Sequence, residues 1–291
     1  MIDLKGRIAI ITGAGGGLGR AHAHLLAQRG ARIVVNDIGP AAASVAEEIV
    51  HAGGHAVAGI GSVTDAARMQ QIVDETVSRW GRVDILVNNA GVLRDKTFAK
   101  MSLEDFRLVV DVHLMGSVHC TKAVWDTMRQ QRYGRVVFTT SSSGLYGNFG
   151  QSNYGAAKLA LVGLMQTLAL EGAKYDIRVN CVAPTASTQM LEGLLPPEQL
   201  AMLRPELVSP AVLALVSEEA PSRAILCAGA GSFELAKITL TQGAHIGGDP
   251  PSAESVLMRW AELADPRGET VPAQGSEQRE FELRNARGRR T

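Results

Sequence analysis

The sequence has few cysteines and no excess of charge of either sign, and each shortage excludes a class of protein. Its three cysteines, Cys120, Cys181 and Cys227, lie on apolar segments without metal-ligand spacing. We therefore expect reduced core residues in a cytoplasmic protein, and no bound metal. Lys plus Arg number 29 and Asp plus Glu also number 29. This balance gives no overall attraction to nucleic acid or to an anionic membrane surface.

Long apolar runs are also missing. No stretch approaches the ~18 consecutive apolar residues that suggest a membrane-spanning helix. The first residues lack the basic, apolar, small-residue order of a signal peptide. The chain of 291 residues is long enough to bury a large core and fits one domain of a doubly wound α/β protein.

A glycine-rich turn follows the first apolar run. Residues 7–12 (Arg-Ile-Ala-Ile-Ile-Thr) predict a buried parallel strand, and residues 20–29 predict a helix that ends at Gly30. Between them, glycines at positions 13, 17 and 19 would let the backbone approach a pyrophosphate at the helix N-terminus. The alternative is a tight turn without a ligand, but the flanking strand and helix favour a nucleotide site.

The next predicted strand, residues 32–37, ends on Asp37, about 20 residues after the glycines, where dinucleotide folds place a ribose-binding acid. A carboxylate there accepts hydrogen bonds from a free ribose diol and repels a 2′-phosphate. No Arg or Lys lies within the glycine turn or just after Asp37. The pattern favours NAD over NADP, although Asp37 could instead cap the following helix.

Strand-like and helix-like segments then alternate. Residues 56–60, 83–88, 135–140 and 178–183 are strand-like, and the amphipathic segments 65–80, 103–130 and 152–174 separate them. Alternation of this kind predicts an α/β fold of Rossmann type, a doubly wound parallel sheet with helices on both faces. We expect a catalytic domain over residues 1–243. A C-terminal extension, residues 244–291, follows with a short helix near 252–263 and a flexible basic tail.

Four motifs occur in order along the chain: a glycine turn over residues 12–19, Asn-Asn-Ala-Gly at 88–91, a serine at 141, and Tyr154-x-x-x-Lys158. With these motifs the first 240 or so residues resemble the classical short-chain dehydrogenases/reductases. Within that superfamily, residues 13–20, 35–37, 91–96 and 146–151 look most like the (3R)-hydroxyacyl-CoA dehydrogenase domains of the peroxisomal multifunctional enzymes of type 2. Those domains also belong among the 17β-hydroxysteroid dehydrogenases.

The resemblance implies roles for three of these motif residues. Tyr154 would be the acid/base, Ser141 would hold the substrate oxygen, and Lys158 would lower the tyrosine pKa and hold the nicotinamide ribose. A free tyrosine titrates near ~10, so work near neutral pH needs a drop of roughly 2–3 units. One ammonium at ~4 Å would supply about 4 kcal/mol toward it at an effective dielectric of 20.

The chain departs from the family pattern at three places. His113 stands where most members have a relay asparagine, and it is either a proton-relay residue or an ordinary core histidine. Ser62 and Val63 replace the usual acid after the third strand. Pro184-Thr185 replaces Pro-Gly, which leaves Thr185, Ser187 and Thr188 as hydroxyl candidates for the nicotinamide carboxamide.

Together these arguments give a complete candidate site with NAD as cofactor. The predicted catalytic residues are Ser141, Tyr154, Lys158 and His113. The predicted cofactor contacts are Gly13, Gly15, Gly17, Leu18, Gly19, Asp37, Ser62, Val63, Asn89, Ala90, Gly91, Tyr154, Lys158, Pro184, Ser187 and Thr188. The predicted substrate contacts are Ser141, Leu145, Phe149 and Met190.

The substrate is expected to be hydrophobic, because Met and Leu residues crowd the segment after Pro184 and suit an acyl chain or a steroid ring. The leading hypothesis is NAD-dependent interconversion of a secondary alcohol and a ketone on a 3-hydroxyacyl-CoA. Alternatives are a hydroxysteroid dehydrogenase, a 3-oxoacyl-carrier-protein reductase, or a dinucleotide sensor without turnover. Arg94, Lys96 and Lys100 could contact CoA phosphates or form a solvated loop. A homodimer or homotetramer is expected from the family.

Overall fold

The computed structural model describes residues 1–186, 196–248 and 250–287. The chain divides into two compact units, Met1–Leu235 and Ala236–Thr291. The larger unit contains the sheet, with the helices that pack on it, and all the sequence motifs discussed above.

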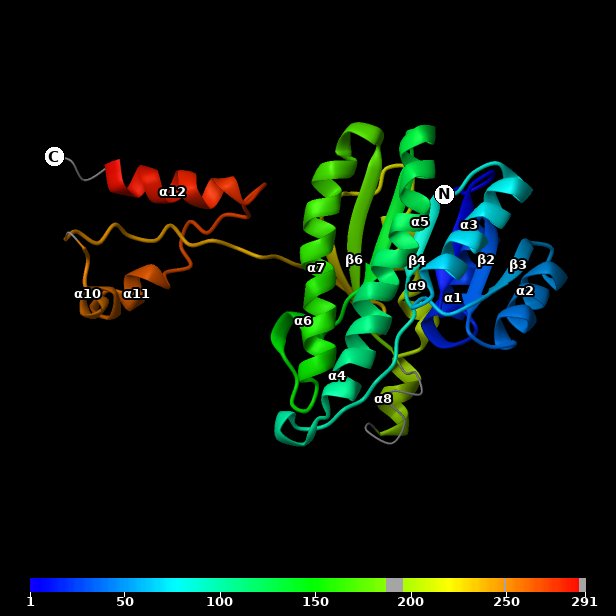
Figure 1. Cartoon of the computed structure of the whole chain (residues 1–291), viewed down its shortest axis with the longest axis horizontal. Coiled ribbons are helices and arrows are strands. Elements are labelled where there is room, and N and C mark those ends of the chain that lie inside the picture. The colour runs from blue at the N-terminus through cyan, green and yellow to red at the C-terminus, as the bar shows by residue number, and fades with distance from the viewer. Residues whose placement is uncertain (187–195, 249, 288–291) are drawn as a thin grey trace. The chain divides into compact units, whose positions relative to one another are not determined.

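One eight-stranded sheet forms the centre of the larger unit (Figure 1), in the order β3-β2-β1-β4-β5-β6-β7-β8. Strands β1 to β7 pair in parallel, as the alternation of strands and helices predicts. The strand bounds are Ile8–Thr12 (β1), Arg32–Asp37 (β2), His55–Ile60 (β3), Ile85–Asn88 (β4), Gly134–Thr139 (β5), Ile177–Thr185 (β6), Ile225–Gly229 (β7) and Ser232–Ala236 (β8).

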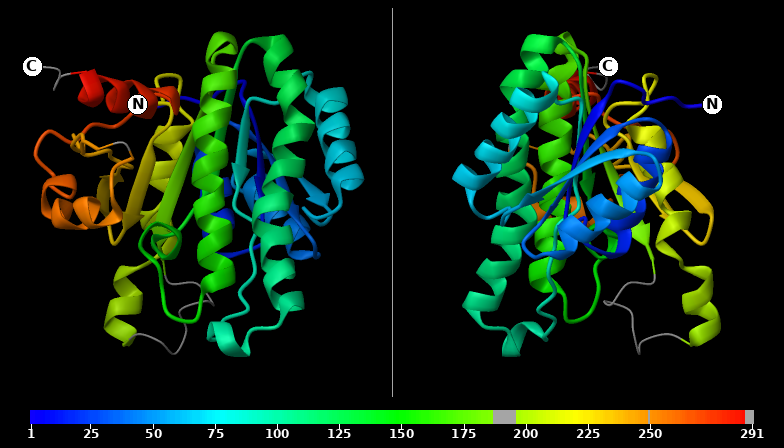
Figure 2. Two further views of the ribbon diagram at one scale, coloured as in Figure 1. Left: turned by 60° about the vertical axis from the view of Figure 1, so that its left-hand side comes forward. Right: turned by 90° about the vertical axis from the view of Figure 1, so that its right-hand side faces the viewer.

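Helices cover both faces of this sheet, and Figure 2 shows the two helical layers on either side of it. One layer contains α1 and α2 with α9, and the other contains α3, α5 and α7. The main helix bounds are Gly17–Gln28 (α1), Ala41–His51 (α2), Ala66–Trp80 (α3), Leu103–Val110 (α4), Gly116–Gln131 (α5), Ser142–Tyr146 (α6), Ser152–Gly172 (α7), Pro197–Met202 (α8) and Ser209–Leu215 (α9). The doubly wound fold class predicted from the sequence is confirmed.

The core lies where the apolar strands meet these helices. All five residues of β1 are buried, as are all four of β4 and all six of β5. Strands buried on both faces need continuous apolar runs rather than alternation, and this is why periodicity located them. Parallel pairing also brings the carboxyl ends of β1, β2, β4, β5 and β6 to one edge of the sheet.

The segment 103–130, predicted as one amphipathic stretch, is interrupted. α4 passes into a turn of π-helix, Asp111–Met115, before α5 begins at Gly116. Single π-turns inside helices often occur at functional sites, and this one contains His113.

α7 is apolar on every side, and by length and composition alone the stretch Ser152–Tyr175 could cross a membrane. It contacts β5 and β6 as well as α4 and α6. Packing on the sheet accounts for only part of the composition of α7, because 39% of the apolar stretch is buried.

The smaller unit contains α10 (Ala253–Met258), α11 (Trp260–Leu263) and α12 (Ser276–Arg287), with one antiparallel bridge between Leu240 and Thr270. The composition of the tail gave no indication of α12, whose i,i+4 pair Gln278–Glu282 is hydrogen-bonded at 2.9 Å. Among its described residues no apolar side chain is fully buried, and Trp260 is 63% exposed. The unit thus lacks a hydrophobic core of its own.

Candidate active site

The glycine turn after β1 is tied to the segment after β4. The Thr12 hydroxyl accepts hydrogen bonds from the backbone N–H groups of Asn89 (3.0 Å) and Ala90 (3.1 Å). The Asn89 side chain in turn donates to the carbonyls of Thr12 and Gly13. Gly13 has a positive φ of 61°, and a Cβ there would lie 2.7 Å from the Ala90 Cα. Only glycine therefore permits this approach of the two segments.

Asp37 lies at the carboxyl end of β2 and faces the glycine turn. Its carboxylate accepts hydrogen bonds from the backbone N–H of Gly15 (2.9 Å) and of Ile38 (2.7 Å). Arg20, the basic residue that follows the turn, forms an ion pair with Glu48 at 2.8 Å. Negative charge therefore dominates this end of the turn.

Gly17 begins α1, Gly19 is buried within it, and Leu18 packs on the core. The N-cap of α1 has no side-chain hydrogen bond. The backbone donors of the first turn therefore depend on another acceptor, such as an anion at the helix N-terminus.

Ser62 and Val63 form the turn between β3 and α3. The Ser62 hydroxyl pairs with that of Thr64 (2.8 Å). Val63 is buried, and its carbonyl lies 3.0 Å from the His119 Nδ1. Both residues lie after the carboxyl end of β3, the edge strand beside β2, but the side chain of Val63 packs inward.

Tyr154, Ser141 and Lys158 come together beyond the carboxyl end of β5. Ser141 caps α6, and its hydroxyl hydrogen-bonds the Tyr154 hydroxyl. Lys158, one turn along α7 from Tyr154, places its Nζ 5.5 Å from the centre of the tyrosine ring. That ammonium is buried and donates to the Thr139 carbonyl at 2.5 Å.

Burial dominates the ionisation of both groups. It lowers the pKa of Lys158 to about 7. It also raises the pKa of Tyr154, which the Ser141 hydrogen bond lowers and the Asp95 carboxylate raises. The role of Lys158 in lowering the tyrosine pKa stays a prediction.

His113 also packs against the tyrosine. Its ring meets the Tyr154 ring edge-to-face, with centroids 5.2 Å apart. The Nε2 atom lies 2.8 Å from the Val92 carbonyl and 3.1 Å from the Val92 N–H, so it donates to one or accepts from the other according to tautomer. The Nδ1 atom is buried without a protein partner, and burial lowers the His113 pKa to about 3.

Gly91 makes room for this histidine, because a Cβ at position 91 would overlap the imidazole. The backbone of the Asn89–Gly91 segment therefore lies between the glycine turn and the Tyr154 cluster. The geometry joins the nucleotide motif to the catalytic motif through residues that the sequence separates widely.

The predicted substrate contacts are only partly described. Leu145 is half-buried on α6, whereas Phe149 is 88% exposed. Pro184 is half-buried and Thr185 exposed at the end of β6. Ser187, Thr188 and Met190, with most of the apolar segment after them, lie outside the described residues.

The residues present fit a dinucleotide. The glycine turn provides backbone donors at a helix N-terminus, and Asp37 provides an acceptor where a ribose would lie. At the carboxyl edge, the Asn88 Oδ1 and the Thr139 Oγ1 are buried without a hydrogen-bond partner. Unpaired buried polar atoms are costly, and a polar ligand at this edge could satisfy them.

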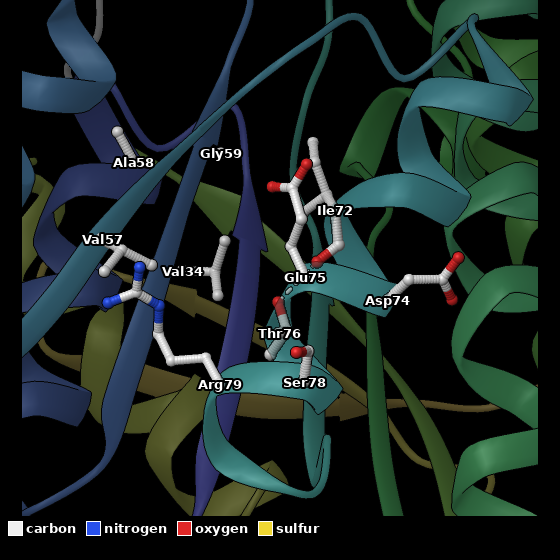
Figure 3. Close-up of a pocket in the computed structure, with 10 residues that line it drawn as sticks. All are labelled: Val34, Val57, Ala58, Gly59, Ile72, Asp74, Glu75, Thr76, Ser78 and Arg79. Carbon is white, nitrogen blue, oxygen red and sulfur yellow. Dashed lines mark hydrogen bonds between the residues drawn. The ribbon is translucent and has the colours of Figure 1, made fainter.

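A cavity of about 710 Å³ opens elsewhere, between α3 and strands β2 and β3 (Figure 3). Apolar residues such as Val34 and Ile72 line it together with Glu75 and Arg79. No predicted site residue lines it, so we place the candidate active site at the carboxyl edge instead.

Sequence reasoning missed two residues beside Tyr154. The Asn153 side chain is fully buried and donates to the Arg94 carbonyl at 3.1 Å. The Gln151 side chain donates to the Asp95 carboxylate at 2.6 Å. Their position just before Tyr154 was the available signal, but their partners lie more than fifty residues away.

The basic loop residues have a structural partner. Lys96 and Arg94 both approach Asp105, at 2.9 and 3.8 Å. Lys96 lowers the pKa of the Asp105 carboxyl through its hydrogen bond.

Comparison with known proteins matches residues 7–198 to the family model described as short chain dehydrogenase. A short-chain type dehydrogenase/reductase of Mycobacterium tuberculosis is 46% identical over 282 residues, covering 93% of this chain and 98% of the relative. The peroxisomal hydratase-dehydrogenase-epimerase of Saccharomyces cerevisiae is 45% identical, covering 91% of this chain but only 31% of that enzyme. The chain thus spans about a third of that multifunctional relative.

Two solved structures are similar to the chain. Full-length peroxisomal multifunctional enzyme type 2 from Drosophila melanogaster matches with a TM-score of 0.84 and 38% identity, over 97% of this chain and 50% of that one. A 7α-hydroxysteroid dehydrogenase complexed with NADH and 7-oxo glycochenodeoxycholic acid matches with a TM-score of 0.73 and 34% identity, over 79% of this chain and 95% of that one. Both the sequence and structure comparisons therefore point to one family of oxidoreductases and to a nicotinamide dinucleotide as cofactor.

Proposed function

The chain belongs to the short-chain dehydrogenase family, and from this premise we propose that it is an NAD-dependent dehydrogenase of 3-hydroxyacyl-CoA thioesters. The observation that carries the proposal is the cluster of Tyr154, Ser141 and Lys158 beside the dinucleotide turn. A protein that only sensed the dinucleotide would not need these three side chains together.

Each side chain has a distinct task in this proposal. The Tyr154 hydroxyl takes the proton of the substrate alcohol in oxidation and returns it to the carbonyl oxygen in reduction. The Ser141 hydroxyl, already bonded to Tyr154, holds the same substrate oxygen. When bound, NAD accepts the hydride and brings a positively charged ring.

Lys158 supplies positive charge close to the phenol ring of Tyr154. Because burial lowers its pKa to about 7, the ammonium carries about half a charge near neutral pH. Its proximity to Tyr154 supports a role in stabilising the tyrosinate and in holding ribose hydroxyls.

His113 packs edge-to-face against the Tyr154 ring. Its buried, unpaired Nδ1 provides an acceptor or donor that a water molecule could use. With a pKa of about 3 it stays neutral at physiological pH, which suits a relay and excludes a role as a permanent cation.

Asp37 supports NAD over NADP. Its carboxylate is fixed by two backbone N–H groups, and the neighbouring Arg20 is paired with Glu48. A 2′-phosphate at this place would meet a carboxylate with no described free cation beside it. The proposal predicts at least a tenfold preference for NAD in kcat/KM, equivalent to about 1.4 kcal/mol.

The acyl-CoA assignment rests on similarity over nearly the whole chain to multifunctional enzymes that carry a dehydrogenase segment. The hydratase and epimerase activities in the name of the yeast relative belong to an enzyme three times as long, and we do not assign them here. The pairing of Arg94 and Lys96 with Asp105 leaves the CoA phosphates without an assigned contact.

The test is the formation of NADH from NAD, or of NADPH from NADP, by the purified protein. The substrates would be a (3R)-hydroxyacyl-CoA, the matching free hydroxy acid and a 17β-hydroxysteroid. Turnover of the thioester with NAD supports the proposal. Turnover of the steroid alone would mean that the substrate is a steroid and not a thioester. Equal use of NAD and NADP would overturn the role of Asp37.

A hydroxysteroid dehydrogenase is the second candidate, because the bile-acid enzyme matches most of the chain. A 3-oxoacyl-carrier-protein reductase would typically use NADPH, which Asp37 disfavours. The steroid arm of the assay separates the first alternative and the NADPH arm separates the second.

We further propose that the protein assembles as a homodimer or homotetramer in the cytoplasm. The large apolar helix α7 still exposes Leu159 and Leu170, at 46% and 49%. Light scattering that shows only monomers at micromolar concentration would contradict the assembly.

A further inference from the structure

A row of hydrogen bonds joins two loops directly beside Tyr154. Three consecutive residues after β4 take part: the Arg94 carbonyl accepts from Asn153, the Asp95 carboxylate accepts from Gln151, and the Lys96 N–H donates to the Gly150 carbonyl. The distances are 3.1, 2.6 and 2.9 Å. All three partners lie within four positions of the proposed acid/base.

The row continues away from the site through a second amide. The Asn148 side chain donates to the Gln151 Oε1 at 3.0 Å, which orients the Gln151 amide so that its NH₂ faces Asp95. Asp95 is therefore held in a fixed place by a partner that is itself fixed.

The charge of Asp95 is not neutralised among the described residues. Its only described side-chain partner is the neutral Gln151 amide. The adjacent cations, Arg94 and Lys96, both turn to Asp105 instead. A negative charge is thus kept beside Tyr154 although either neighbour offers a cation.

Three other titratable or polar groups face Tyr154. Lys158 approaches from its own helix, His113 from the π-turn, and Ser141 from the start of α6. Lys158 is the only cation of the three, since His113 stays neutral. Asp95 therefore sets the sign of the field on the loop side of the phenol.

We propose that Asp95 is a specificity-determining residue, which disfavours substrates that carry a carboxylate close to the reacting carbon relative to neutral thioesters and ketones. In a free 3-hydroxy acid the carboxylate lies two bonds from the carbon that Tyr154 serves. In the thioester the carbonyl group that takes the place of this carboxylate is uncharged. The inference rests on the proposed function, because it concerns the substrate of the same site.

The expected size of the effect is modest, because Asp95 is exposed and water screens its field. Two like charges several ångströms apart at such a site should discriminate by about fivefold.

The experiment compares two substrates that differ in charge alone, 3-hydroxydecanoate and its methyl ester, by NADH formation in wild type and Asp95→Asn. Asparagine keeps an acceptor for Gln151 but removes the charge. We expect the acid-to-ester ratio of kcat/KM to rise about fivefold. The ratio is measured within one preparation, so a lower folded fraction cancels.

The matched control is Glu104→Gln, which removes an exposed carboxylate from the first turn of α4 and leaves Asp105 paired with Arg94 and Lys96. Its acid-to-ester ratio should equal that of wild type. An unchanged ratio in Asp95→Asn, or an equal rise in Glu104→Gln, would overturn the proposal. The enzyme concentration is raised until the wild-type rate on the free acid is measurable, so that the ratio is defined for every variant.

The same assay separates this inference from the proposed function. Turnover of the hydroxyacyl-CoA with no effect of Asp95→Asn refutes the role of Asp95 and leaves the dehydrogenase assignment in place. No turnover of any hydroxyacyl substrate, with turnover of the steroid, refutes the assigned substrate instead.

Discussion

The buried cations at the two ends of the parallel strands differ in whether they have a carboxylate partner. We call these ends the amino edge and the carboxyl edge of the sheet. At the amino edge, the fully buried Arg135 donates to the carbonyls of Gly134, Asp176, Ser217 and Glu218 and pairs with the Asp176 carboxylate. At the carboxyl edge, Lys158 is equally buried but has no described carboxylate partner. The cation at the amino edge is therefore paired with a carboxylate. The Lys158 amine at the carboxyl edge has no such described partner, and it loses its proton near pH 7.

The amino edge has a second compensated centre. The buried Asp84 accepts from the Ile8 N–H and from the side chains of Arg7 and Arg82. The Tyr133 ring lies between the guanidinium groups of Arg7 and Arg135, 3.7 and 4.1 Å from them. The buried Tyr133 hydroxyl has no hydrogen-bond partner, but the charges around it are paired. Paired charges of this kind belong to the structure of the fold, whereas a lone group with a perturbed pKa marks a candidate site of chemistry.

The largest expected effect separates chemistry from stability. Tyr154→Phe should lower kcat/KM by about 10³-fold, because general acid–base catalysis contributes roughly 10²–10⁴. NAD affinity and thermal stability should stay close to wild type. Steady-state kinetics with calorimetry of NAD binding tests this, and a variant that retains a tenth of the activity would remove Tyr154 from its role.

A substitution at the amino edge should lower the stability of the protein and leave its catalysis unchanged. Arg135→Met leaves buried carbonyls and Asp176 without their donor, so we expect a loss of about 3–5 kcal/mol in the free energy of unfolding. The kcat of the folded fraction should not change. Arg178→Met is the matched control, since Arg178 also bonds Asp176 but is partly exposed, and it should cost about 1 kcal/mol. Urea unfolding of both variants decides; equal losses would mean that burial does not set the cost.

Lys158→Met should sharpen the comparison. The folded-state pKa of about 7 lies below the 10.5 of an unperturbed lysine, so the unfolded chain binds more protons between these values. Charging the buried amine therefore destabilises the fold, and this penalty is relieved as pH rises from 7 toward 10.5. Methionine should raise stability at pH 6 by roughly 2 kcal/mol while reducing turnover by at least 10²-fold. A melting temperature below that of wild type would contradict this account.

Histidine gives the smallest of the four effects. Burial lowers the pKa of His22 to about 3, against 6.5 in the unfolded chain, while its Nδ1 pairs with the Ser209 hydroxyl at 2.8 Å. The stability from the neutral ring is present above pH 6.5 and is lost as pH falls toward 3. At pH 5.5 the loss should be roughly 1.5 kcal/mol, and His22→Phe should flatten that part of the unfolding profile. His24→Asn, at a partly exposed position on the same helix, should not.

The sequence predicted the motifs well because their chemistry is local. Tyr154–Lys158 lies within α7, and Thr12–Gly19 runs from the end of β1 through a short turn into α1, so sequence spacing places the residues of each motif near one another. The strands β1 to β6 follow from apolar runs in the same way. Strands β7 and β8 were not predicted. Ile225–Gly229 is a short strand of mixed burial, and Ser232–Ala236 is mostly exposed and carries no continuous apolar run.

Long-range pairs were beyond the sequence. Nothing in the neighbourhood of Arg135 indicates that its partner carbonyls lie 41 to 83 positions away. The Asp95–Gln151 contact spans 56 positions. Such pairs depend on the sheet register, which is set by the packing of the whole domain.

The π-turn at Asp111–Met115 has a consequence for how the active site and the helical layer can vary. A turn of this kind holds one residue more than an α-helical turn, so the extra residue bulges while the helix beyond it keeps its phase. The helix that begins at Gly116 can therefore pack on β4 and β5 as though no residue had been inserted. The residue at position 113, next to Tyr154, therefore lies in the bulge. A substitution there can change the active site without changing how α5 packs on the sheet.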